Sequence, residues 1–188
     1  MGTQRIAEAG RWSQAGRQAL VSGTLASVFS TAVLAWQGYR RYRKPAAPTN
    51  ATSHWLWGDQ DALAASDVSL RHTGVGYATH HASACMWALL YERWLDRGEV
   101  PSNGQIIRDA ALMTALAAFV DYRLTPRRLR PGFENHLSAG GMLAVFAAFG
   151  AGLAAGALIN RQHERRLRRV LTLPAGWALA RPEAKIRS

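Results

Sequence analysis

The sequence predicts an all-α fold, a polytopic membrane protein built as a four-transmembrane-helix bundle. The first observation behind this prediction is a set of apolar stretches, at about residues 18–39, 73–95, 105–124 and 137–160. The second is that most of the charge lies in the connections between these stretches and after the last one. The third is that all 7 prolines lie where connections are expected. We therefore treat residues 1–188 as one membrane domain that ends in a basic cytoplasmic tail, residues 161–188.

The composition excludes several classes of protein. Hydrophobic residues make up 48% of the 188 residues, which is too large a share for a disordered chain. The single cysteine, Cys85, excludes a disulfide framework and any metal site built from several cysteines. The net charge of +11 is typical of nucleic-acid-binding proteins. Because the basic residues are separated by long uncharged stretches, we expect the lipid bilayer, and not nucleic acid, as the main partner.

The first and last apolar stretches are the best suited to cross a bilayer, which needs about 20 apolar residues in a helix. Residues 18–39 carry no formal charge and are flanked by Arg17 and Arg40. Residues 137–160 are also uncharged and end at Arg161. A cleaved signal peptide is the alternative for the first stretch, but the apolar run is long for one and no convincing A-x-A site follows it.

The two middle stretches are less apolar. Residues 73–91 are uncharged but contain two adjacent histidines and two glycines. The third stretch has an uncharged centre of only 11 residues, bracketed by Asp109 and Asp121, so a buried helix of a soluble protein is the alternative there. We expect this stretch to span the membrane, because charges at the ends of a span can reach the interface or pair with a partner.

The basic residues predict an orientation. With four spans both termini lie on one side, which then holds 14 basic residues against 9 on the other side. The positive-inside rule then predicts that both termini lie on the cytoplasmic side of a bacterial inner membrane, chiefly because of the basic residues in 161–169. The basic run at residues 40–44, directly beside the first stretch, argues for the opposite orientation.

Small residues recur at every fourth position on several of the predicted helices. Two of these rows are Gly23, Ser27 and Thr31, and Ala148, Gly152 and Gly156. In lipid, such rows let helix backbones approach closely. We expect them to be helix-packing faces, either inside the bundle or against other membrane subunits, including further copies of the chain.

Histidines and carboxylates gather in the part of the chain that is expected on the outer side. The candidates are His80, His81, Asp121 and His136. The second and third stretches are joined by a short connection, so they should be antiparallel neighbours with Asp121 near His80 or His81. Imidazole and carboxylate groups can bind zinc or another transition metal, and histidine titrates nearest to neutral pH. However, the adjacent His80 and His81 point about 100° apart on a helix, which disfavours chelation.

Three roles are open for these residues: a structural cluster, a proton-linked function, or a metal site. We expect the first, because the chain contains no H-E-x-x-H, E-x-x-H or C-x-x-C pattern. It also lacks the signatures of phosphate-binding loops and of nucleophilic serine hydrolases. We therefore predict no catalytic residues and no cofactor, with zinc or a transition metal as the alternative.

Three features resemble a group of small bacterial inner-membrane proteins, the YagU-like family. They are the histidines at the outer end of the second helix (His80 and His81), the third helix ending in Leu-Thr-Pro (residues 124–126), and the Gly- and Ala-rich run 150–156. The resemblance covers about residues 74–160 and implies a polytopic inner-membrane protein with no assigned catalytic activity and a link to acid tolerance. The chain departs from that group in its SHWLWG segment and its Arg-rich tail.

The function expected from these observations is that of a non-enzymatic structural or assembly component of a membrane complex, linked to stress or acid. The alternative is a small membrane enzyme or transporter that uses the His/Asp cluster of the outer face to handle a metal or protons.

Overall fold

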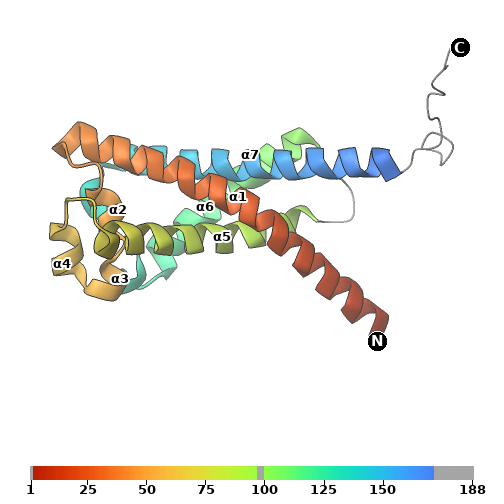
Figure 1. The fold of residues 1–188 in the computed structure, drawn as a ribbon, viewed down its shortest axis with the longest axis horizontal. Helices are drawn as coiled ribbons and strands as arrows, with labels where there is room; N and C mark the ends of the chain where they lie inside the picture. The colour runs from red at the N-terminus through yellow and green to blue at the C-terminus, as the bar shows by residue number, and fades with distance from the viewer. Residues whose placement is uncertain (1, 97–99, 172–188) are drawn as a thin grey trace, which may run out of the picture.

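The computed structural model describes residues 2–96 and 100–171, and within these residues every regular element is helical (Figure 1). The four long helices are α1 (Gly2–Tyr42), α5 (Val75–Leu95), α6 (Asn103–Phe119) and α7 (Ala139–Leu171). Single π-helical segments precede α5 and follow α6: η1 (Leu70–Gly74) and η2 (Val120–Leu124). Short helices fill the two longer connections: α2 (Ala47–Ala51), α3 (His54–Trp57), α4 (Asp59–Ala64), η3 (Arg127–Leu129) and η4 (Phe133–His136).

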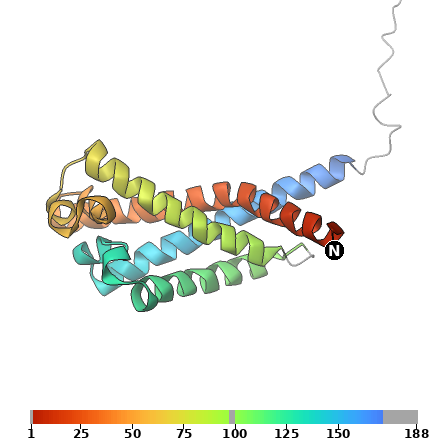
Figure 2. The same ribbon diagram turned by 90° about the horizontal axis from the view of Figure 1, so that it is seen from below.

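The long helices alternate in direction along the chain (Figures 1 and 2). Helix α1 packs against both α5 and α7, and α6 packs against α7, whereas α5 and α7 touch each other at few points. The three short helices α2, α3 and α4 form a cap, residues 47–64, over one end of the long helices (Figure 1). The start of α1 and the end of α7 both lie at the opposite end, so the bundle has a cap end and a terminal end.

Glycines allow α1 to approach its two neighbours closely. A Cβ atom on Gly156 of α7 would lie 2.3 Å from the Cα atom of Ser22 in α1. Gly152 makes the same kind of contact one turn earlier. A Cβ atom on Gly23 of α1 would lie 2.7 Å from the Cα atom of Cys85 in α5. At these points the helices touch through their backbones, which no larger residue permits.

The structure corrects the prediction of four membrane spans. Among the described helices only α1 and α7 are long and apolar enough to cross a membrane, over Gln4–Tyr42 and Ala139–Arg166. The 21 residues of helix α5 include two histidines, one threonine, one serine and the charged pair Glu92–Arg93. Helix α6 has 17 α-helical residues and contains the charged pair Arg108–Asp109, so it is less suited than α1 and α7 to an apolar hydrocarbon core. The polytopic four-span bundle is therefore wrong, and two helices suited to a membrane remain.

Several boundaries differ from those expected from the sequence. Helix α1 begins at Gly2, far before residue 18, and its exposed first part, residues 4–14, extends away from the other long helices (Figure 1). Helix α7 continues to Leu171, so the predicted basic tail begins as part of a helix. The rest of that tail, residues 172–188, lies outside the described residues.

Local signals define both ends of α6. The Ser102 hydroxyl accepts a hydrogen bond from the Gln105 backbone N–H at 3.2 Å, and the Gln105 side chain accepts one from the Ser102 N–H at 2.7 Å. This reciprocal capping starts the helix. At the other end η2 leads to Pro126, which cannot continue a helix. Asp121 is thereby held in the last turn of this continuous segment, beside the cap end.

A buried polar network joins the long helices near the terminal end. Glu92 of α5 is fully buried and accepts hydrogen bonds from Ser22 of α1 and from Asn160 of α7, the latter at 2.9 Å. A guanidinium nitrogen of Arg161, also buried, lies 3.1 Å from the second carboxylate oxygen of Glu92. These partners satisfy a charge that would otherwise be costly to bury. The network therefore fixes the relative positions of α1, α5 and α7.

Candidate functional site: a cavity beneath the cap

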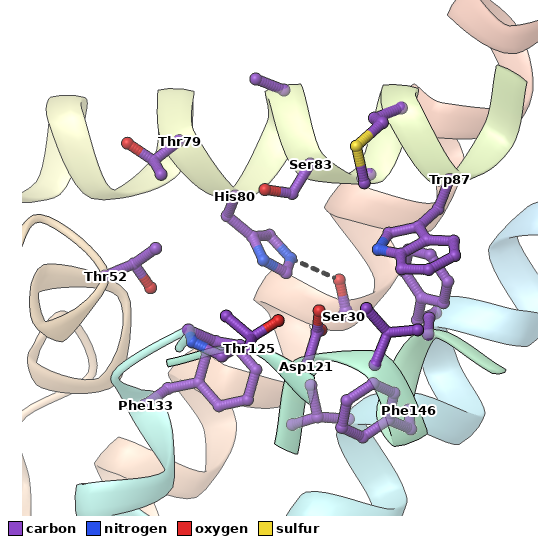
Figure 3. Close-up of a pocket in the computed structure, with 18 of the residues that line it drawn as sticks. Ser30, Thr52, Thr79, His80, Ser83, Trp87, Asp121, Thr125, Phe133 and Phe146 are labelled. Atoms are coloured by element: carbon purple, nitrogen blue, oxygen red, sulfur yellow. Dashed lines mark hydrogen bonds between the residues drawn. The ribbon is translucent and has the colours of Figure 1, made fainter. Parts of the chain in front are cut away.

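A cavity of about 430 Å³ lies between α5, α6 and α7, beneath the cap (Figure 3). It occupies the region where α5 and α7, which touch at few points, leave room between them. Most of its wall is apolar, and large side chains dominate it: Trp55, Met86, Trp87, Phe133, Phe146 and Phe149. The chain thus encloses a concave, largely apolar space.

Helical periodicity explains how α5 supplies one wall. His80, Ala84 and Trp87 follow one another at spacings of four and three residues, which places them on one face of a helix. On α7, Val145 and Phe149 follow the same rule at a spacing of four. The regular helices therefore direct a row of side chains from each side into the same space.

The cap closes the cavity at its outer end through hydrogen bonds to the connection before α7. The indole N–H of Trp55 donates to the carbonyl oxygen of Arg130 at 2.9 Å, and Nε2 of His54 lies 2.8 Å from the same oxygen. Gly132 has a positive φ of 90°, and a Cβ atom there would lie 2.6 Å from the carbonyl oxygen of Ala51. The cap and this connection therefore fit together without space for a larger residue.

Ser30, His80 and Asp121 are among the polar side chains that line the cavity, and they lie near one another (Figure 3). Nε2 of His80 lies 2.8 Å from the Ser30 hydroxyl oxygen, which also lies 2.7 Å from the carbonyl oxygen of Ala26. A hydroxyl has one proton, and a carbonyl can only accept. Ser30 therefore donates to Ala26 and accepts from the N–H of His80, which leaves Nδ1 of His80 as an acceptor.

The surroundings keep His80 uncharged. Burial, with a smaller contribution from neighbouring His81, lowers the pKa of His80 from 6.5 to about 4. The ring also packs edge-on against Phe133, with 6.1 Å between ring centroids. At neutral pH the histidine is thus a neutral hydrogen-bonding group in an apolar wall.

Asp121 is the ionisable group on the opposite wall. Burial, and then the negative charge of Glu134, raise the pKa of its carboxyl group from 3.8 to about 6. Within residues 2–96 and 100–171 no side chain or backbone group forms a hydrogen bond or ion pair with this carboxylate. The cavity therefore contains a carboxylate without a partner of its own.

The structure brings together only part of the predicted His/Asp cluster. His80 and Asp121 line the same cavity, whereas His81 does not line it. Nδ1 of His81 lies 2.8 Å from the Ser27 hydroxyl, and its Nε2 lies 3.6 Å from Sγ of Cys85, both at the contact between α1 and α5. His81 therefore bridges two helices.

The fourth candidate, His136, also lies away from the cavity. Its ring packs edge-on against Tyr42 at the end of α1, with 6.1 Å between centroids. In the described part of the chain no group of three or more His, Cys, Asp or Glu side chains is placed to hold a metal ion. The residues on which the metal alternative rested, His80, His81, Asp121 and His136, do not form one set of metal-ligating atoms.

Sequence reasoning missed most of the cavity. In the sequence, Ser30 is one more small residue in an apolar stretch, and Trp55 of the SHWLWG segment is typical of a residue at a membrane–water interface. Phe133 and Phe146 carry no local signal, because their role depends on contacts with residues far away in the chain. Helical spacing, as in His80, Ala84 and Trp87 or in Val145 and Phe149, is the local pattern that indicates a shared face.

Comparisons with models of protein families, with curated proteins and with solved structures gave no match to this chain. The resemblance to the YagU-like family therefore stays a prediction, and the function has to be argued from the cavity.

Proposed function

We propose that this chain is a membrane-associated helical protein that binds an apolar small molecule in the cavity beneath its cap. The observation that carries the proposal is the cavity itself, with a volume of about 430 Å³ and a wall rich in aromatic side chains. Small-molecule sites are typically concave and apolar, measure about 300–1,000 Å³, and contain a few polar groups that orient the ligand. Ser30, His80 and Asp121 are such groups.

The energetics of apolar cavities support this function. An unfilled cavity lined by large side chains forfeits the dispersion contacts that those side chains would otherwise make. A ligand that enters restores these contacts and stabilises the folded state, because it binds the folded chain and not the unfolded one. Trp55 and Trp87 would contact such a ligand directly.

We further propose that α1 and α7 hold the protein in a bacterial inner membrane. Exposed Trp36 lies under the guanidinium of Arg40 at 5.0 Å, and exposed Trp12 lies beside Arg93 at 5.4 Å. The two tryptophans are about 36 Å apart along α1 at 1.5 Å per residue, close to the spacing of the two interfaces of a bilayer. Such aromatic residues favour the membrane–water interface.

The orientation we propose has both termini in the cytoplasm. Helices α1 and α7 run in opposite directions, and the ends nearest the chain termini lie together at the terminal end (Figure 1). The basic residues in the second half of α7 and beyond favour the cytoplasmic side for that end. The cap would then face the outside of the cell membrane.

A structural or assembly role is the second candidate function. It is favoured by the outer face of α6, where Leu112, Leu116 and Phe119 are exposed although α6 is not a candidate span. Exposed apolar faces of this kind commonly contact other proteins. The mass of the purified protein in detergent, measured by light scattering, distinguishes a monomer from a self-associated form.

Energy transfer from tryptophan tests the binding function. The full chain, held in amphipol, is titrated with the apolar fluorophore N-phenyl-1-naphthylamine. Energy transfer from its 7 tryptophans, of which Trp55 and Trp87 line the cavity, is recorded. Ser83→Phe places a ring in the cavity, whereas Ala78→Phe places the same ring on the exposed side of the same helix. We expect saturable transfer in the wild type and in Ala78→Phe, and a loss of at least tenfold in affinity in Ser83→Phe. Equal transfer in all three proteins would contradict the proposal.

A further inference from the structure

We infer that the ligand of this cavity is an organic cation, an apolar body that carries a positively charged nitrogen, and that Asp121 binds its charge. This inference rests on the proposed binding function and adds the chemical class of the ligand. It is carried by the position of an unpartnered carboxylate in the wall of an aromatic-lined cavity (Figure 3).

The first step is the cost of the Asp121 carboxylate. A carboxylate facing an apolar space loses the hydration that it has in water, unless a cation or a hydrogen-bond donor replaces it. Among the described residues no such group is bonded to Asp121. Arg130, a cationic side chain of the following connection, instead donates to the carbonyl oxygens of Tyr122 at 3.1 Å and Thr125 at 3.4 Å. A cationic ligand would supply the missing partner.

The second step is the sign of the local field. Helix α5 contributes His80, which is uncharged at neutral pH, and η4 contributes Glu134, whose negative charge acts on Asp121. The Tyr122 hydroxyl, the other titratable group here, donates to Glu134 at 3.4 Å. The cavity-lining residues of α1 and α7 carry no charge. Asp121 is therefore the charged side chain that lines the cavity, which favours a cation and disfavours an anion.

The third step is the aromatic wall. Trp87 and Phe146 line the cavity together with Asp121 (Figure 3). Trp55 of the cap is a further aromatic residue of the cavity wall. The face of an aromatic ring attracts a cation within about 6 Å, and the attraction increases when water is excluded. Aromatic rings and one carboxylate together match both parts of an organic ammonium ion, its charge and its apolar substituents.

The test compares two probes of the same shape and different charge. Benzyltrimethylammonium is a cation, and neopentylbenzene has a carbon atom in place of its nitrogen. Binding of both to the full chain in amphipol is measured by tryptophan fluorescence, in the wild type, in Asp121→Asn and in Asp67→Asn. Asp67 is an exposed aspartate on the segment after the cap and serves as the matched control.

We expect the wild type and Asp67→Asn to bind the cation at least tenfold more tightly than the neutral probe. Asp121→Asn should lose this preference and keep its affinity for the neutral probe. If the wild type binds both probes equally, or prefers the neutral one, the inference fails while the binding function stands. If neither probe binds, the proposed function fails as well. The comparison of probes in the wild type decides the question even if Asp121→Asn does not fold.

Discussion

His80 and Asp121 are two titratable residues whose pKa values are shifted in opposite directions by their surroundings. Burial holds the histidine neutral down to about pH 4, and it holds the aspartic acid protonated up to about pH 6. Burial disfavours the charged form in both cases, and it therefore lowers the pKa of a base and raises that of an acid. Both residues consequently make the stability of the fold depend on pH, with opposite signs.

The two dependences should be separable by substitution. Between about pH 4 and 6 the folded chain retains a proton on Asp121 that the unfolded chain releases, so this residue makes the free energy of unfolding fall as pH rises. Between about pH 4 and 6.5 the unfolded chain binds a proton at His80 that the folded chain does not bind. This residue therefore makes the free energy of unfolding rise as pH rises. In the wild type the two effects oppose each other.

Thermal unfolding between pH 4 and 6.5 measures this balance. Relative to the wild type, Asp121→Asn should gain stability more steeply with rising pH, because the contribution of Asp121 no longer opposes that of His80. His80→Gln should show the opposite change. If thermal stability changes with pH in the same way in the wild type and in both variants, the pKa values of the two residues are not shifted as described.

At the scale of the elements, α1 is the helix that organises the others. Helices α5 and α7 both pack along it, and glycines make both contacts close. The rows of small residues that include Gly23 and Gly156 lie at these contacts. Each glycine can be recognised in the sequence of its own helix, but the partner that it contacts lies on another helix.

Gly156→Ala tests the contact between α1 and α7. The added methyl group would lie 2.3 Å from a backbone atom of Ser22, so the two helices must move apart. We expect a loss of about 1–3 kcal/mol in the free energy of unfolding. Gly140→Ala in the same helix is the control, because a Cβ atom there meets nothing within 4 Å. Its stability should stay unchanged or rise slightly. Stability is measured by denaturant unfolding in detergent. An equal loss of stability in the two variants would contradict the close contact.

At the scale of the whole molecule, the proposed membrane orientation makes the two ends of the bundle differ in accessibility. In a Cys85→Ala background, single cysteines at exposed Gly10 and at exposed Gln60 of the cap report on the terminal end and the cap end. A membrane-impermeant maleimide added to intact cells should label position 60 and not position 10. After lysis it should label both positions. Labelling of position 10 in intact cells would contradict cytoplasmic termini.

Two properties of the described residues follow from the order of residues along the chain: the regular structure is helical, and the first and last apolar stretches form long apolar helices. Both properties are local, because they follow from the order of apolar residues along one segment. The expectation of a span was wrong for α5 and α6. Helix α5 has a long uncharged stretch, but its two histidines, one threonine and one serine make it less apolar than α1 and α7. In α6, the charged residues Arg108 and Asp109 lie within the helix.

The place where a ligand can bind depends instead on how the helices pack together. The cavity exists because α5 and α7 contact α1 and hardly contact each other, and because the cap closes one end of the space between them. Ser30, His80 and Asp121 come from three separate segments, and no local pattern connects them. Helix formation is a short-range property of the chain, whereas a cavity and the pKa of a group within it depend on contacts between residues that are distant in sequence.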